Sequence, residues 1–175
     1  MLSIRPATAE DIPLILALIR ELAEYERAPE QAVARPEDLL RDGWGPQPKF
    51  RVLIAEWDDR PAGFALFFYN YSTWQGRPGL YLEDLFVRPE FRGRGIGKAL
   101  LVRLARMAVS ENCGRFQWAV LDWNQPSIDF YEALGAKRLS EWLIMRVEGE
   151  ALHRLAKEDS TAKETKGHKG QEITG

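Results

Sequence analysis

The sequence has few of the residues that metal sites and disulfides need. Its 175 residues include one cysteine, Cys113, and two histidines, His153 and His168. A single cysteine cannot form an intrachain disulfide, and the histidines do not stand at a zinc-ligand spacing. We therefore expect no metal site and no structural disulfide.

Long apolar runs and an excess of positive charge are also missing. No segment is apolar enough over about 20 residues to span a bilayer, and Met1–Pro6 lacks the pattern that starts a signal peptide. The net charge of −2 argues against nucleic-acid binding, which usually needs a basic face. With 45% hydrophobic residues, the chain is long enough for one globular domain. We expect a cytoplasmic protein with neither a nucleic-acid nor a membrane partner.

The apolar pattern alternates between helical and strand periods, which predicts a mixed α/β fold. Thr8 and Asp11 form a capping box before the first helix, and Pro36 opens the second. Predicted helices cover residues 8–23, 36–41, 96–108, 127–134 and 149–157, and predicted strands cover 3–5, 50–57, 62–71, 80–87, 116–121 and 137–147. We expect one domain over residues 1–156 and a disordered tail over 157–175, which is rich in Lys, Glu, Thr and Gly.

A glycine-rich turn, Arg92-Gly93-Arg94-Gly95-Ile96-Gly97-Lys98, opens the helix that follows the 80–87 strand. Backbone N–H groups at such a turn converge on an anion and suit a pyrophosphate. The dinucleotide fingerprint fails because Lys98 stands where its third glycine belongs, and a P-loop fails because Ala99 replaces its Ser or Thr. A plain structural turn remains the alternative.

Together with its neighbours, this turn resembles the acetyl-CoA motif of the GNAT family of N-acetyltransferases. The strand Tyr81–Val87 precedes it, and Asn124–Tyr131 resembles the second signature of that family. Within the family, the diamine and thialysine acetyltransferases are most similar, through the segments Glu21–Glu26, Asp42–Gly45, Tyr81–Asp84 and Trp123–Asn124. The resemblance covers Ser3 to about Ala156. It implies a mixed, predominantly antiparallel sheet with flanking helices.

The resemblance implies acetyl-CoA as acetyl donor, bound along one strand, the glycine-rich turn and the second signature. The implied contacts are Leu85, Phe86, Val87, Arg92, Gly93, Arg94, Gly95, Ile96, Gly97, Lys98, Asn124, Gln125, Pro126, Ser127 and Tyr131. Phe86 and Val87 would pair with the pantetheine arm through their backbones, beside a bulge from which the next strand splays.

Amine acetylation needs a proton acceptor, because an alkylamine has a pKa of about 10. Neighbouring carboxylates on a strand point to opposite faces, so either Glu83 or Asp84 can face a cleft. The resemblance favours Glu83, acting through water, the Leu85 N–H as oxyanion donor and Tyr131 as the acid that protonates the thiolate. Alternatively, the acids only solvate a strand edge and Tyr131 only packs. Cys113 lies outside the predicted cleft, so we expect direct transfer.

The acceptor is expected to be a small cationic amine. The resemblance places Tyr25, Glu26, Glu83, Asp84, Gln117, Trp118 and Ala119 around it. Diamine enzymes carry an acid in the loop where this chain reads Tyr71-Ser72-Thr73-Trp74, which favours a thialysine-like acceptor over a polyamine. Other amines, such as a protein lysine or an aminoglycoside, and a non-catalytic acyl-CoA or polyamine sensor are the alternatives. The matched group implies a homodimer, for which Trp142–Met145 offers apolar surface.

Overall fold

The computed structural model describes residues 1–158. It divides the chain into two compact units, Met1–Gln125 and the residues from Pro126 onward, and each is described by itself. The tail predicted over 157–175 lies almost wholly outside the described residues. The predicted single domain over 1–156 stays a prediction.

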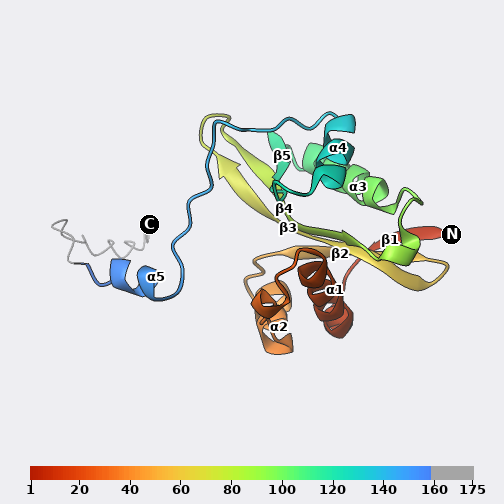
Figure 1. Cartoon of the computed structure of the whole chain (residues 1–175), viewed down its shortest axis with the longest axis horizontal. Helices are drawn as coiled ribbons and strands as arrows, with labels where there is room; N and C mark the ends of the chain where they lie inside the picture. The colour runs from red at the N-terminus through yellow and green to blue at the C-terminus, as the bar shows by residue number, and fades with distance from the viewer. Residues whose placement is uncertain (159–175) are drawn as a thin grey trace, which may run out of the picture. The chain divides into compact units, whose positions relative to one another are not determined.

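The first unit contains one five-stranded sheet in the order β1-β2-β3-β4-β5 (Figure 1). β1 (Leu2–Pro6), β2 (Arg51–Trp57), β3 (Arg60–Ser72) and β4 (Arg77–Val87) are antiparallel to their neighbours, whereas β5 (Arg115–Trp118) is parallel to β4. The β2–β3 turn is Asp58-Asp59, with both residues in the left-handed conformation that Asp tolerates in tight hairpins. The predicted mixed, mostly antiparallel sheet is confirmed.

Helices cover both faces of this sheet (Figure 1). α1 (Ile12–Tyr25) and α2 (Pro36–Trp44) pack on one face, in a buried cluster that includes Ile15, Leu18, Phe64, Leu66 and Phe86. α3 (Ile96–Ser110) packs on the other face, against β2, β3 and β4. Short 3-10 turns lie at η1 (Ala9–Asp11), η2 (Pro29–Gln31) and η3 (Pro89–Phe91). The Thr8–Asp11 capping box forms as predicted, with the Thr8 N–H donating to Asp11 at 2.8 Å.

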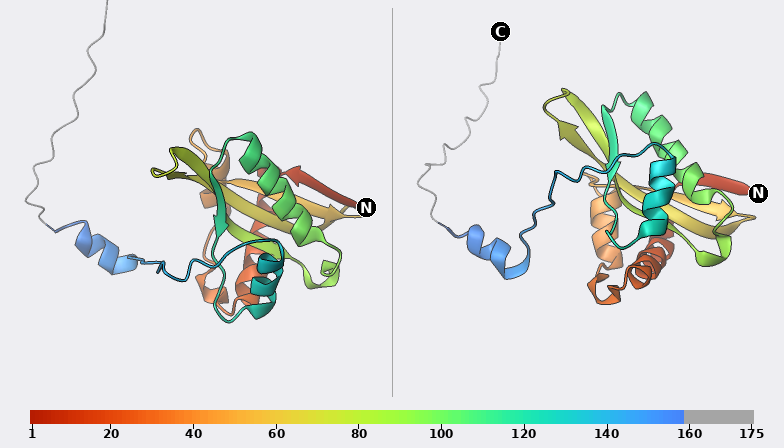
Figure 2. Two further views of the ribbon diagram at one scale, coloured as in Figure 1. Left: turned by 90° about the horizontal axis from the view of Figure 1, so that it is seen from above. Right: turned by 45° about the horizontal axis from the view of Figure 1, so that its top comes forward.

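The β3–β4 hairpin extends past β2 (Figure 2). β3 pairs with β2 only as far as Phe67, and from Phe68 to Ser72 it pairs with β4 alone. The hairpin tip therefore lies several residues along the strands from the middle of the sheet.

The second unit contains α4 (Gln125–Ala133), whose first residue closes the first unit, and α5 (Gly149–Leu155). The strand predicted over 137–147 is wrong, because that segment forms no strand and Trp142, Leu143, Ile144 and Met145 are 67–87% exposed. β propensity alone is not sufficient, since a strand needs a hydrogen-bonding partner. β5 also ends at Trp118 rather than at the predicted Leu121. No helix within residues 1–158 is long and apolar enough to cross a membrane.

Candidate active site

A bulge in β4 changes the direction in which its acids point. Leu66 of β3 pairs with Asp84, but the next residue, Phe67, pairs with Leu82, so Glu83 is an extra residue without a partner on β3. Residues directly opposite in an antiparallel pair share a face. Asp84 therefore lies on the α1 face with Leu66, and the strict alternation that predicted opposite faces for Glu83 and Asp84 is broken here.

Three carboxylates gather at this bulge. Burial raises the pKa of Asp84 to about 7, with further contributions from the nearby charges of Glu83 and Glu26. Partial burial also raises the pKa of Glu26, at the C-terminal end of α1. Burial, together with the charge of Glu83, raises the pKa of Tyr81. We call Glu26, Glu83 and Asp84 the acidic cluster; it forms a site that favours a cation.

The edge of β4 is open beside the acidic cluster. β5 pairs with β4 only from Gly79↔Arg115 to Leu82↔Trp118, whereas β4 continues to Val87. Within this open edge, the Phe86 side chain is buried in the core, so only the Phe86 backbone can contact a ligand. Leu85 and Val87 are half-buried. The arrangement matches the predicted splay and could accept an extended chain as an added strand.

The glycine-rich turn presents free backbone donors at the start of α3. Gly93 and Gly95 have φ of 75° and 77°, a region that glycine enters without steric cost. Among residues 1–158, no backbone acceptor is recorded for the N–H groups of residues 93–98. A Cβ on Gly95 would have nothing within 4 Å, so the space over the turn is open. These features suit an anion at a helix N-terminus.

Two basic side chains of the turn have contacts of their own. Arg94 lies over the ring of Trp57, 5.1 Å from its centroid, and Lys98 is exposed. Arg92 Nε donates to the Val87 carbonyl at 2.9 Å, and its guanidinium lies 4.8 Å from the Tyr25 ring centroid. Arg92 therefore links the turn to the end of β4 and the end of α1.

An ion pair joins α1 to Arg88, the residue that directly follows β4. Arg88 donates to both carboxylate oxygens of Glu21, with Nη2–Oε1 at 2.7 Å and Nε–Oε2 at 2.9 Å. Arg88 Nη1 also donates to the Pro61 carbonyl at 3.0 Å. This bidentate contact holds the C-terminal turn of α1, and with it Tyr25 and Glu26, beside the strand that carries Asp84.

Tyr25 and Asn124, predicted for substrate and cofactor respectively, meet in the structure. Tyr25 Oη donates to Asn124 Oδ1 at 3.2 Å, and Asn124 is buried. The Tyr25 and Trp123 rings lie 6.4 Å apart, and the Arg27 guanidinium lies 4.5 Å from the Trp123 centroid. Sequence reasoning assigned no site role to Arg27 or Trp123. The available signals were the position of each beside a predicted residue and, for Trp123, its place in the matching segment Trp123–Asn124.

The remaining predicted residues lie on β5 and α4. Gln117 and Trp118 are half-buried and pair with Tyr81 and Leu82, and Ala119 follows the end of β5. Gln125, Pro126, Ser127 and Tyr131 all belong to α4, where the Tyr131 ring lies 5.3 Å from Phe130. Their roles stay predictions.

Ser72, on which the acceptor preference was argued, lies at the hairpin tip. It is 6% exposed, and its Oγ accepts the Gln75 N–H at 3.3 Å inside the turn. It pairs with Arg77, five residues along the hairpin from Leu82 at the bulge, or roughly 17 Å at about 3.4 Å per residue. Within one chain, this loop does not reach the acidic cluster.

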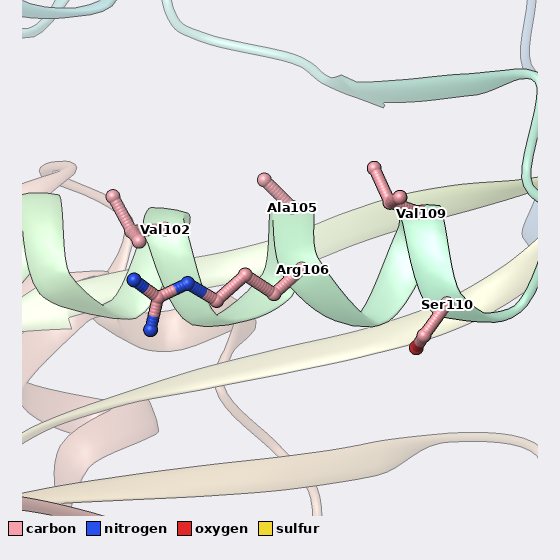
Figure 3. A pocket seen from close by; sticks show the side chains of 5 residues that line it. All are labelled: Val102, Ala105, Arg106, Val109 and Ser110. Atoms are coloured by element: carbon pink, nitrogen blue, oxygen red, sulfur yellow. The ribbon is translucent and has the colours of Figure 1, made fainter.

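Two further features lie outside this site. A shallow apolar pocket on the outer side of α3 is lined by Val102, Ala105, Arg106, Val109 and Ser110, well along the helix from the glycine-rich turn (Figure 3). Burial raises the pKa of Cys113, which favours the protonated thiol over the nucleophilic thiolate. No cluster of three or more potential metal ligands occurs in residues 1–158.

Known proteins resemble this chain in both sequence and structure. The model of the acetyltransferase (GNAT) family matches residues 15–136. A thialysine N-epsilon-acetyltransferase of Bos taurus is 43% identical over 164 residues, covering 87% of this chain and 96% of its own. A spermidine/spermine N(1)-acetyltransferase-like protein 1 of Homo sapiens is 40% identical, over 89% of this chain and 24% of its own. An integron cassette protein from the V. cholerae mobile metagenome has a TM-score of 0.77 at 28% identity, covering 90% of this chain and 98% of its own.

Proposed function

Because the chain belongs to the GNAT family of acetyltransferases, we propose that it moves the acetyl group of acetyl-CoA to the side-chain amine of thialysine or a lysine-like amino acid. The observation that carries this proposal is the acidic cluster at the point where β4 loses its β5 partner. A cationic amine held there lies beside a strand edge that can take an extended acyl carrier.

The described residues fit acetyl-CoA at two places. The N–H groups of 93–98, with Arg94 and Lys98 nearby, would hold the pyrophosphate, and the open edge Leu85–Val87 would hold the pantetheine arm. Asn124, Gln125, Pro126 and Ser127 would line the same arm. When bound, acetyl-CoA supplies the acetyl thioester.

The residues of this chain would then move protons and stabilise charge. Glu83 is exposed on the bulge and would take a proton from the amine through water, while Asp84 holds the cation. The Leu85 N–H would stabilise the negative charge that develops on the acyl oxygen. Tyr131 would give its proton to the departing thiolate. The nitrogen–carbon bond forms as the carbon–sulfur bond breaks, and no cysteine is acylated.

We also propose that the protein is a homodimer. The supporting observation is the exposure of Trp142, Leu143, Ile144 and Met145, a contiguous apolar segment of the kind that marks protein interfaces. Analytical ultracentrifugation of the wild type and of Leu143→Asp tests this. A wild type that is monomeric at micromolar concentration contradicts it. The predicted cytoplasmic location stays a prediction.

Thioester consumption with a panel of amines tests the main proposal. The wild type is expected to have a higher kcat/KM with thialysine and lysine than with spermidine. The variant Glu83→Gln should lose most of its turnover with all three amines. If spermidine is preferred by tenfold, the amino-acid reading is wrong. If no amine stimulates release of CoA thiol, the enzymatic assignment itself fails.

A further inference from the structure

Helix α1 ends at a left-handed residue that is not glycine. Arg27 has φ of 63°, and the hydrogen bonds from Arg27 N–H to Glu24 O (3.1 Å) and from Ala28 N–H to Ala23 O (2.9 Å) form the usual closing pattern of a helix. Glycine is the usual residue at this position, because a side chain strains the left-handed backbone. Strain held at a specific residue suggests that its side chain has a use.

Within residues 1–158, the side chain of Arg27 is held at the site by an aromatic ring and has no acid partner. Its guanidinium lies 4.5 Å from the Trp123 ring centroid, and Trp123 in turn lies beside Tyr25. None of the ion pairs found within residues 1–158 includes Arg27, and the residue is exposed. Stacking on an aromatic ring orients a guanidinium while leaving its N–H groups free for a carboxylate.

The surroundings of Arg27 combine both signs of charge. Glu26 precedes it, and Glu26 acts electrostatically on Asp84. The other nearby arginine, Arg92, already donates to the Val87 carbonyl. A diamine would bring two cations to this place and meet the positive charge of Arg27, whereas an amino acid would bring an ammonium for the acids and a carboxylate for the guanidinium.

We propose that Arg27 binds the carboxylate of an amino-acid acceptor and thereby selects amino acids over diamines. The inference rests on the amine acetylation proposed above. The end of α1 would then distinguish amino acids from diamines. The Ser72 loop would not, because it lies at the far end of the hairpin.

Acceptor pairs that differ only in the carboxylate test this selection. We would measure kcat/KM for lysine against cadaverine, and for thialysine against its decarboxylated form, at one pH and ionic strength. Arg27→Gln and Arg27→Gly remove the charge, and Arg27→Gly also relieves the left-handed backbone, so its Tm should be no lower than that of the wild type. Arg27→Lys keeps the charge, and Arg103→Gln is the matched control, an exposed arginine on α3.

The ratio of amino acid to decarboxylated amine should fall at least about fivefold in Arg27→Gln and Arg27→Gly. It should fall less in Arg27→Lys and stay unchanged in Arg103→Gln. An unchanged ratio in both neutral variants overturns the proposal. A wild type that prefers the decarboxylated amines also overturns it, while amine acetylation stands. A wild type that acetylates none of the four amines refutes the proposed function, and the Arg27 assignment with it.

Discussion

Asp84 should give the folded protein a pH dependence that can be measured without substrate. Its pKa rises from 3.8 to about 7 on folding, so the folded state holds a proton that the unfolded state has lost between these values. Below pH 3.8 the Asp84 side chain is mostly protonated in both states and has little effect on the free energy of unfolding. As the pH rises above 3.8, Asp84 destabilises the folded state increasingly, and the effect levels off above about pH 7. From these two values the cost is about 2 kcal/mol at pH 5 and about 4 kcal/mol at pH 8.

The variant Asp84→Asn removes this titration and keeps the shape of the side chain. Urea denaturation at both pH values measures the difference in free energy of unfolding between Asp84→Asn and the wild type. This difference should be about 2 kcal/mol larger, in favour of the variant, at pH 8 than at pH 5. Glu83→Gln should reduce the pH dependence in part, because the charge of Glu83 contributes to the shift. Glu37→Gln, an exposed acid on α2, is the control and should leave it unchanged.

Equal pH dependence in the wild type and Asp84→Asn would refute this reasoning. It would mean that Asp84 is solvated in the folded state, and that the acidic cluster does not form a partly dry site for a cation. A cationic acceptor bound beside Asp84 should also favour its ionised form, so acceptor binding at pH 6 should release a proton.

Three further predictions follow from the site. Gly95→Val should weaken acetyl-CoA binding at least tenfold, or about 1.4 kcal/mol, because a valine side chain is strained at a φ of 77° and covers the open turn. If calorimetry shows unchanged affinity in a folded variant, the turn is not the anion site. Tyr131→Phe should lower kcat roughly a hundredfold with little change in acetyl-CoA affinity, and a variant that keeps most of its turnover would reduce Tyr131 to packing on Phe130. Ser72→Asp should cost about 1–3 kcal/mol of stability, because it buries a charge in the turn. A stable Ser72→Asp that shifts preference towards spermidine would restore the loop argument.

Local sequence patterns predicted most elements of the first unit. The Thr8–Asp11 box and Pro36 are signals within a few residues of the helices they start, and both helices form. The glycine-rich turn was also readable, because Gly93 and Gly95 must adopt left-handed backbone at a helix start. Such features need no knowledge of distant residues.

Features that depend on distant partners could not be predicted from local sequence patterns. The family resemblance implied a bulge near Leu85, but its position at Glu83 exists only in the pairing of β4 with β3. The contact of Arg27 with Trp123 joins a residue just after α1 to the segment before α4. The segment Trp142–Met145 has strand-forming residues but no ladder, since pairing decides whether such a run becomes a strand. The position of Ser72 likewise depended on hairpin register rather than on its neighbours in sequence.

The bulge accounts for the order of residues in Leu82-Glu83-Asp84-Leu85-Phe86. In a regular strand, Asp84 would share a face with both Leu82 and Phe86, which are buried, and Glu83 would share the opposite face with Leu85. The extra residue moves Leu82 to the face of Phe67 and Leu85, and leaves Asp84 on the α1 face with Phe86, where Glu26 ends the helix. A bulge also bends its strand and weakens pairing nearby, and the β5 ladder stops at Leu82, directly before it. One inserted residue thus accounts for both the acidic cluster and the open edge of β4, so the cation site and the strand edge proposed for the acyl carrier are adjacent because they have the same cause.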